Sequence, residues 1–155
     1  MISCISPGIR TGRILGDARR PSLAQGGPPL RILVVDDHET VRRGVCSILE
    51  SRRNTEICGE AANGQDAIEM ASQLKPDLII LDVTMPRLDG FAAVRQIRTF
   101  LPEVPILMLS MHEGQRIARE AQQAGAQGFV SKSAAGQVLL KAVEAVLQGQ
   151  TFFPT

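Results

Sequence analysis

LIILD at residues 78–82 is the strongest strand signal in the sequence: four consecutive apolar residues run directly into a carboxylate. An apolar run of this length without polar alternation is typical of a strand that is buried on both faces of a parallel sheet. A similar run, LRILVV at residues 30–35, is followed by Asp36 and Asp37. We therefore predict two buried strands that each end at acidic residues.

Helical spacing takes over after each predicted strand. Val41, Val45 and Leu49 follow the first strand at intervals that place them on one face of a helix. The same alternation continues along the chain, with a turn at residues 63–64 and Ser133 as the cap of the last helix. The five predicted strands lie at residues 30–35, 56–59, 78–81, 105–109 and 128–130. This alternation predicts an α/β fold whose parallel sheet is covered by helices on both faces.

Composition excludes several classes of protein. The chain has 155 residues, a formal net charge of +1 and 3% aromatic residues, with no Trp or Tyr. Nucleic-acid coating requires a basic excess and base stacking requires aromatic side chains, so neither function is expected. Three cysteines without a C-x-x-C pair argue against a disulfide framework or a zinc site. Because no apolar run approaches the ~20 residues of a membrane helix and no secretory signal is visible, we expect a cytoplasmic protein.

Residues 1–29 differ in composition from the rest of the chain. They are rich in Pro, Gly and Ser, and their four Arg against a single Asp make them basic. We interpret this segment as a flexible tail, because such a composition cannot bury enough apolar surface to fold. A basic arm that binds nucleic acid or acidic lipid is the alternative, which the scattered, non-periodic arginines disfavour.

Five polar side chains stand at the carboxyl ends of four predicted strands. Asp36 and Asp37 follow the first strand, Asp82 the third, Ser110 the fourth and Lys132 the fifth. In an open parallel sheet, ligands bind beyond the carboxyl ends of the strands, at the point where the strand order reverses. If the strand order is 2-1-3-4-5, the first and third strands are neighbours there. The three carboxylates then converge beside a hydroxyl and an ammonium group.

This combination of groups predicts a particular chemistry. Crowded carboxylates repel one another, and a hard divalent cation such as Mg²⁺ relieves the repulsion. The cation, an ammonium and a hydroxyl together suit a dianionic phosphoryl group, and a carboxylate there can act as the nucleophile that forms an acyl phosphate. Each residue alone has a simpler interpretation: Asp37 as a helix cap, Ser110 as a loop hydroxyl, Lys132 as a solvated charge. Their coincidence at four strand ends favours the site.

Five segments resemble the receiver domain of two-component response regulators, and together they extend over residues 30–150. They are residues 32–38, 77–86, 88–90, 110 and 128–132. Residues 59–64 and 109–113 look most like the NarL/FixJ subfamily, whose members usually carry a LuxR-type helix-turn-helix domain after the receiver. The resemblance implies a flavodoxin-like, doubly wound five-stranded parallel sheet in the order 2-1-3-4-5.

The resemblance also implies a role for each carboxylate of the predicted site. Asp82 would accept the phosphoryl group. Asp37 and Asp82 would ligate Mg²⁺ directly, and Mn²⁺ could substitute for it. The backbone carbonyl of Thr84 would be a further metal ligand, while Asp36 would act through a bound water molecule.

Three further residues would bind the phosphoryl group or respond to it. By resemblance, Lys132 would pair with one phosphoryl oxygen and Ser110 would donate a hydrogen bond to another. Phe129 would turn inward as Ser110 moves. Receivers commonly carry Lys-Pro at this point, whereas Ser133 follows the lysine in this chain, so a cis peptide bond is not forced.

Three alternative functions fit the residues less well. A haloacid-dehalogenase-type phosphatase would place an acid two residues after its nucleophilic aspartate, where this chain has Thr84 or His38. An FMN-binding flavodoxin would need a Ser/Thr/Gly-rich phosphate loop after the first strand, where Asp36 and Asp37 would repel the phosphate. A histidine metal site is disfavoured because Mg²⁺ prefers oxygen ligands, so His38 and His112 are expected on the surface. The resemblance to receiver domains implies no enzyme activity beyond Mg²⁺-dependent self-phosphorylation and slow autodephosphorylation.

The expected organisation is a tail at 1–29, a receiver domain at 30–150 and the start of a linker or a C-terminal tail at 151–155. By resemblance, the phosphodonor would be a sensor histidine kinase, phosphorylation could promote a homodimer, and a LuxR-type effector absent from this chain would control transcription. A stand-alone receiver that acts through protein contacts or phosphorelay is the alternative. Because residues 30–155 carry a small acidic excess, we expect no specific DNA binding by this chain alone. Without an apolar span, we expect no membrane partner.

Overall fold

The computed structural model describes residues 27–154, so nearly all of the predicted tail at 1–29 lies outside the described residues. Within them, strands and helices alternate along the chain as the sequence predicts. The elements are β1 (Leu30–Val35), α1 (Glu39–Glu50), β2 (Thr55–Ala61), α2 (Gly64–Leu74), β3 (Leu78–Asp82), α3 (Gly90–Phe100), β4 (Ile106–Ser110), α4 (Gln115–Ala124), β5 (Gly128–Ser131), a 3-10 turn (Lys132–Ala134) and α5 (Ala135–Leu147).

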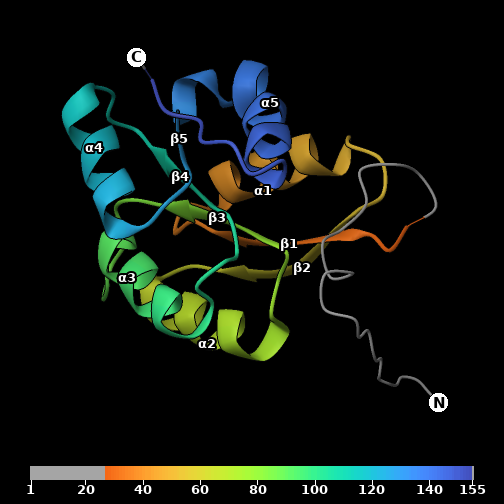
Figure 1. The fold of residues 1–155 in the computed structure, drawn as a ribbon, viewed down its shortest axis with the longest axis horizontal. Helices are drawn as coiled ribbons and strands as arrows, with labels where there is room; N and C mark the ends of the chain where they lie inside the picture. Colours follow the sequence, from red (N-terminus) through yellow and green to blue (C-terminus); the bar gives the residue numbers. More distant parts are fainter. Residues whose placement is uncertain (1–26, 155) are drawn as a thin grey trace.

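The strands form one parallel sheet in the order β2-β1-β3-β4-β5, which confirms the expected topology (Figure 1). At its carboxyl edge, Val35 of β1 lies opposite Leu81 of β3. Ser110 of β4 lies opposite Ser131 of β5 in the same way. This register brings the residues that follow β1, β3, β4 and β5 to the same edge of the sheet.

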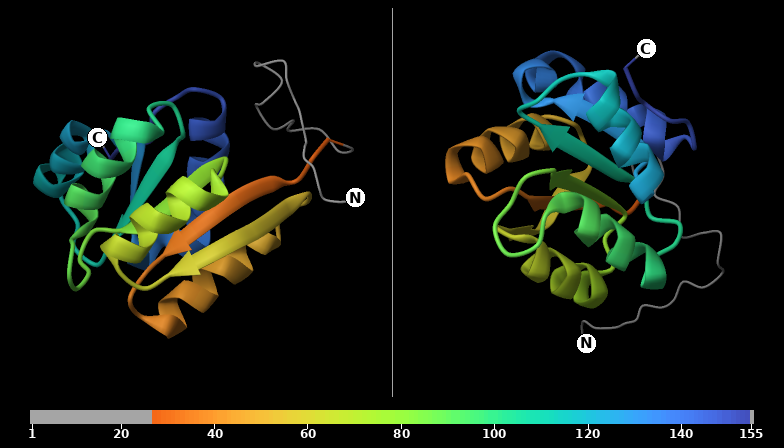
Figure 2. Two further views of the ribbon diagram at one scale, coloured as in Figure 1. Left: turned by 90° about the horizontal axis from the view of Figure 1, so that it is seen from below. Right: turned by 90° about the vertical axis from the view of Figure 1, so that its left-hand side faces the viewer.

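Helices cover both faces of the sheet, with α1 and α5 on one side and α2, α3 and α4 on the other (Figures 1 and 2). The side chains of β3 alternate between the two resulting cores. Ile79 and Leu81 pack on the α2, α3 and α4 side, whereas Leu78 and Ile80 pack on the α1 and α5 side. A strand buried on both faces needs apolar residues at every position, which explains the uninterrupted run. The weaker signal of β2 fits its place at the edge, where most of its residues stay partly exposed.

Two local predictions about helix starts are corrected. The turn predicted at residues 63–64 is instead the start of α2: the Asn63 side chain accepts a hydrogen bond from the Asp66 backbone N–H and caps the helix, whose first residue is Gly64. Ser133 does not cap α5. The hydroxyl of Ser131 instead accepts the Ser133 backbone N–H and begins the 3-10 turn, after which α5 starts at Ala135 without a side-chain cap. The interposed turn moves the capping position two residues toward the N-terminus.

The segment after α5 adds to the sheet beyond β5. Phe152 pairs with Gly128 in a parallel bridge. The backbone N–H of Phe129 donates to the Phe152 carbonyl at 2.8 Å, and the Phe152 N–H donates to the Gln127 carbonyl at 3.0 Å. A Cβ at Gly128 would contact the side chain of Leu107 and the Phe152 carbonyl oxygen. Glycine at this position therefore allows the final segment to approach the edge of β5.

None of the helices between residues 27 and 154 has the length and apolar character needed to cross a membrane.

Candidate functional site

Two buried carboxylates stand side by side at the centre of the carboxyl edge. Asp36 follows β1 and is 1% exposed, while Asp82 ends β3 and is 2% exposed. Since β1 and β3 are neighbours where the strand order reverses, both acids lie at the position where such folds bind ligands. Asp37 and His38 complete the group: one ligand atom from each of the four residues lies within 4.8 Å of the others.

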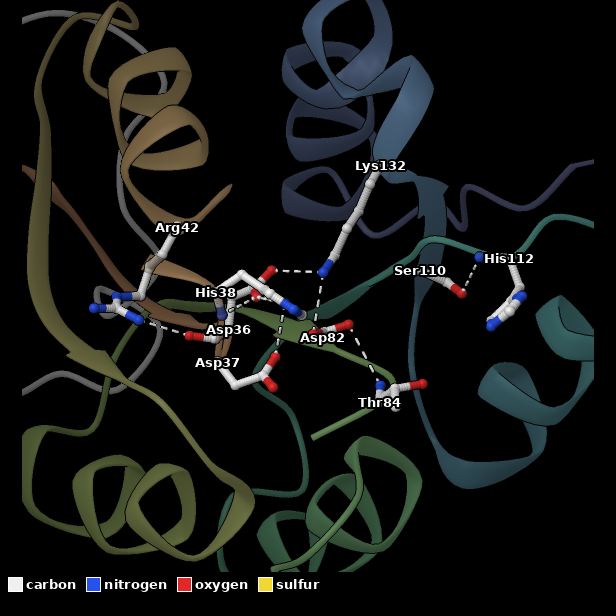
Figure 3. Close-up of polar contacts among 9 residues, drawn as sticks. All are labelled: Asp36, Asp37, His38, Arg42, Asp82, Thr84, Ser110, His112 and Lys132. Atoms are coloured by element: carbon white, nitrogen blue, oxygen red, sulfur yellow. Dashed lines mark hydrogen bonds and ion pairs between the residues drawn. The ribbon is translucent and has the colours of Figure 1, made fainter. Parts of the chain in front are cut away.

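A lysine that follows the edge strand β5 reaches both acids (Figure 3). Lys132 Nζ lies 2.8 Å from Asp36 Oδ2 and 3.1 Å from Asp82 Oδ2. Burial lowers the pKa of the ammonium group, but the hydrogen bonds and charges of the two carboxylates outweigh burial and raise it. Lys132 therefore stays protonated in the site and offsets part of its negative charge.

The pKa of Asp82 is raised in spite of the neighbouring lysine. Burial and the neighbouring charge of Asp36 raise it from 3.8 to about 6. The hydrogen bond and charge of Lys132, and a long hydrogen bond from the Thr84 N–H to Asp82 Oδ1 at 3.4 Å, act in the opposite direction. The repulsion that remains would be relieved by a further cation.

Asp37 and His38 lie at the outer rim of this cluster. His38 Nδ1 lies 3.0 Å from Asp37 Oδ1, and the His38 backbone N–H donates to Asp36 Oδ1 at 2.8 Å. The imidazole is 64% exposed, in line with the expected surface position. Helix α1 begins at Glu39 with His38 as its N-cap residue, so Asp37 is not the helix cap that its simpler interpretation required.

The oxygen atoms of the cluster fit a hard divalent cation. Asp37 Oδ1 is shielded from solvent, and apart from His38 Nδ1 at 3.0 Å no hydrogen-bonding group of the described residues is directed at it. Asp36, Asp37 and Asp82 supply carboxylate oxygens of the kind that Mg²⁺ prefers. The carbonyl of Thr84 is a further metal ligand by resemblance to receiver domains. Thr84 lies next to the carboxylates, since its backbone N–H donates a long hydrogen bond to Asp82 Oδ1.

Within residues 27–154, the Ser110 hydroxyl makes no hydrogen bond to the carboxylates, and Phe129 belongs to the apolar core. Ser110 is buried, and its hydroxyl oxygen accepts the backbone N–H of His112 at 2.9 Å (Figure 3). Phe129 is 3% exposed and packs in the core on the α2, α3 and α4 side. The resemblance implies that the Phe129 ring turns inward as Ser110 moves. In this structure the ring already lies in the core.

The sequence analysis missed two charged residues near the site. The guanidinium of Arg42 donates to the Asp36 backbone carbonyl at 2.7 Å and pairs with Glu60 at 2.8 Å. Arg42 therefore helps to fix the segment after β1 that carries the two adjacent acids. Glu113 accepts hydrogen bonds from Ser131 and Ser133. Neither residue stands at a strand end. Glu113 falls within residues 109–113, whose resemblance to the NarL/FixJ subfamily implied no role for the residue itself, and a single Arg on a helix carries no pattern that would mark it.

Comparison with protein families gives one clear result. Residues 32–144 match the family model described as the response regulator receiver domain. Response regulator UvrY of Escherichia coli (strain K12) is 37% identical over 123 residues, which cover 79% of this chain and 56% of UvrY. Response regulator protein VraR of Staphylococcus aureus (strain Mu3) is 36% identical over 124 residues, which cover 80% of this chain and 59% of VraR. The chain thus spans somewhat more than half the length of these relatives.

A solved structure agrees with this result. The two-component response regulator of the LuxR family from Aurantimonas sp. SI85-9A1 superposes with a TM-score of 0.77 at 36% identity. The superposition covers 80% of this chain and 89% of that one. The similarity therefore supports the five-stranded parallel receiver fold over most of the chain.

Proposed function

The chain belongs to the response regulator receiver domain family, and on that premise we propose that it accepts a phosphoryl group on Asp82 and passes the signal on through a change of conformation. The observation that supports this most is the pairing of one lysine with two buried carboxylates. Lys132 Nζ lies within 3.1 Å of an oxygen of both Asp36 and Asp82. Its charge offsets the negative charge at the point where a phosphoryl dianion would approach.

In the proposed reaction, a carboxylate oxygen of Asp82 attacks the phosphorus atom of a phosphohistidine on a sensor histidine kinase. An O–P bond forms at Asp82 while the P–N bond of the donor breaks, and the leaving imidazole takes up a proton. With acetyl phosphate as donor, the bond between phosphorus and the acetyl oxygen breaks and acetate leaves. Because the pKa of Asp82 is about 6, its carboxylate is largely ionised at neutral pH and can act as the nucleophile.

The other residues of the site would hold and orient the group. Lys132 would pair with one phosphoryl oxygen, and Ser110 would leave the His112 N–H to donate its hydroxyl proton to another. Bound Mg²⁺, for which Mn²⁺ could substitute, would neutralise the charge that builds up between the phosphoryl oxygens and the acids. Asp37, Asp82 and the Thr84 carbonyl would hold the ion, and Asp36 would contact it through water.

The same proposal includes the domain organisation and the process that the receiver would control. We place the receiver at residues 30–150, with a tail at 1–29 and the start of a linker or a C-terminal tail at 151–155. Since relatives such as UvrY and VraR are longer, the function we favour is control of transcription by a LuxR-type effector, with phosphorylation promoting a homodimer. A stand-alone receiver that works through protein contacts or phosphorelay is the second candidate. A cytoplasmic location fits both.

Intact mass spectrometry tests the phosphoryl site. Incubation with acetyl phosphate and Mg²⁺ should add one phosphoryl group to the chain, and EDTA should prevent the addition. Asp82→Asn should remain unmodified, because an amide oxygen is a poor nucleophile. Glu103→Gln, which neutralises an exposed carboxylate outside the site, serves as the matched control and should be modified like the wild type. Equal modification of Asp82→Asn and wild type would show that another residue is the acceptor.

A further inference from the structure

Three side chains form a hydrogen-bonded group beside the site, which we call the Glu113 cluster: Glu113, Ser131 and Ser133. The carboxylate of Glu113 accepts from the Ser131 hydroxyl at 3.0 Å and from the Ser133 hydroxyl at 2.8 Å. The two hydroxyl oxygens also lie 2.8 Å apart. One acid thus ties together two serines that are separated by a single residue.

The residue between the two serines is Lys132. Its backbone begins the 3-10 turn that the Ser131 hydroxyl closes by accepting the Ser133 N–H at 3.2 Å. A lysine side chain has four flexible methylene groups, so its ammonium group is held in place only when the backbone beneath it is also fixed. The Glu113 cluster supplies that fixed point on both sides of Lys132.

The other end of the cluster lies in the loop between β4 and α4. Glu113 follows Ser110 by three residues, and the Ser110 hydroxyl accepts the N–H of His112 within the same loop. Ser110 and Ser131 are also opposite partners in the ladder between β4 and β5. The cluster therefore connects the loop that carries Ser110 with the turn that carries Lys132.

We propose that Glu113 is a positioning residue for phosphoryl binding: through Ser131 and Ser133 it holds the Lys132 turn in a set position relative to the Ser110 loop. This inference rests on the proposed function, because Lys132 and Ser110 are the groups that would contact the phosphoryl oxygens. Glu113 itself touches no reacting atom. Its effect is to keep the Lys132 ammonium group and the Ser110 hydroxyl, which would contact the phosphoryl oxygens, at the right separation.

Two further observations support this role. A proline at position 133 would restrain the turn through its ring, whereas a serine restrains it only through hydrogen bonds of its hydroxyl group. The Ser133 and Ser131 hydroxyl bonds also lower the pKa of Glu113, so the carboxylate that receives them remains charged throughout the neutral pH range. In this chain Glu113 thus restrains the Lys132 turn, which has no proline ring to fix its backbone.

The test compares binding of beryllofluoride, a phosphoryl analogue, with binding of Mg²⁺ alone, each followed by nuclear magnetic resonance titration of the full chain. Glu113→Ala should weaken beryllofluoride binding at saturating Mg²⁺ by about three- to tenfold, the range expected from loss of one or two hydrogen bonds. Mg²⁺ affinity should stay within about twofold, because the cluster contacts none of the three acids. Glu113→Gln should recover most of the loss, since its amide oxygen still accepts from both hydroxyls.

Glu120→Ala removes the same charge from an exposed position on α4 and is the matched control; it should bind beryllofluoride like the wild type. Glu113→Ala combined with Ser133→Ala should cost no more than the larger single change, because both break one cluster. Wild-type binding by Glu113→Ala, additive losses, or an equal loss of Mg²⁺ affinity would each overturn the positioning role. If the wild type itself fails to bind beryllofluoride with Mg²⁺, the proposed function fails, and the inference fails with it.

Discussion

Lys132 and Asp36 form a buried ion pair that joins two strands that are not neighbours in the sheet. Lys132 follows β5 and Asp36 follows β1, so their contact at 2.8 Å passes over the ends of β3 and β4. The side chain of Lys132 is only 6% exposed along this path. The pair therefore closes the carboxyl edge of the sheet and places a cation over Asp82 at the same time.

Replacing this lysine should destabilise the metal-free protein. Lys132→Met leaves the buried carboxylates of Asp36 and Asp82 without their cation, which should lower the free energy of unfolding by about 3 kcal/mol. Mg²⁺ should restore much of the loss and should bind more tightly than to the wild type, because it no longer competes with the ammonium group. Urea unfolding with EDTA or with MgCl2 measures both effects.

Lys141→Met, on the exposed face of α5, is the control for loss of a positive charge. It should change neither stability nor Mg²⁺ affinity appreciably. Unchanged stability of metal-free Lys132→Met would mean that the ion pair contributes nothing and that the carboxylates accommodate their charges in another way.

The raised pKa of Asp82 predicts how stability depends on pH. Burial and the charge of Asp36 raise this pKa from 3.8 to about 6, so between these values the folded state binds the proton more readily than the unfolded state. In EDTA, the contribution of Asp82 to stability should therefore be present at pH 4 and fall as pH rises to 6, by about 2 kcal/mol or less. Asp82→Asn should lack this decrease.

Metal should reverse the direction of this dependence. Mg²⁺ binds the ionised carboxylates, so its stabilising effect should be full at pH 7.5 and decline as pH drops below about 6. Urea unfolding of the wild type across pH 4 to 7.5, with and without MgCl2, compares the two trends. Parallel curves under the two conditions would contradict an ion site that includes Asp82.

The elements that sequence analysis predicted best are those in which one local requirement decides the pattern. β1 and β3 are buried on both faces, so apolar residues fill all their positions except Arg31 and the terminal Asp82, and the run is visible without knowledge of its neighbours. The acids after them were identified because a parallel sheet aligns its strand ends. The strand order itself came from the resemblance to a family, since local periodicity contains no information about which strands pair.

Two of the features that were missed depend on pairs of residues far apart in the chain. Local capping preferences predict Ser133 as a helix cap, whereas its partner is Glu113 in another loop. The sequence predicts residues 151–155 as the start of a linker or a tail and does not reveal that the Phe152 backbone pairs with β5. Ser110 ends β4, as the strand pattern predicts, but the direction of its hydroxyl depends on the His112 amide, a local contact that strand register does not reveal.

The loop after Asp82 should tolerate no side chain at Gly90. A Cβ there would overlap the Asp82 carbonyl oxygen and press on Val83 and Met108. Gly90→Ala should therefore lower the free energy of unfolding by several kcal/mol, about 2–4, because backbone must shift in a closely packed core. Gly44→Ala is the control: nothing lies within 4 Å of its Cβ, and in the exposed interior of α1 it should stabilise by about 1 kcal/mol. Urea unfolding of the two variants should move in opposite directions.

The segment that follows α5 should protect a backbone amide of β5 from hydrogen exchange. The Phe129 N–H donates to the Phe152 carbonyl, so its protection from hydrogen exchange depends on this segment staying against β5. A chain that ends at Gly149 should exchange the Phe129 amide at least about tenfold faster, while amides of β3 at the centre of the sheet change little. Gly128→Ala in the full chain should have a similar effect at Phe129, because its Cβ would meet the Phe152 carbonyl. Equal protection of Phe129 in all three proteins would show that the contact is not maintained in solution.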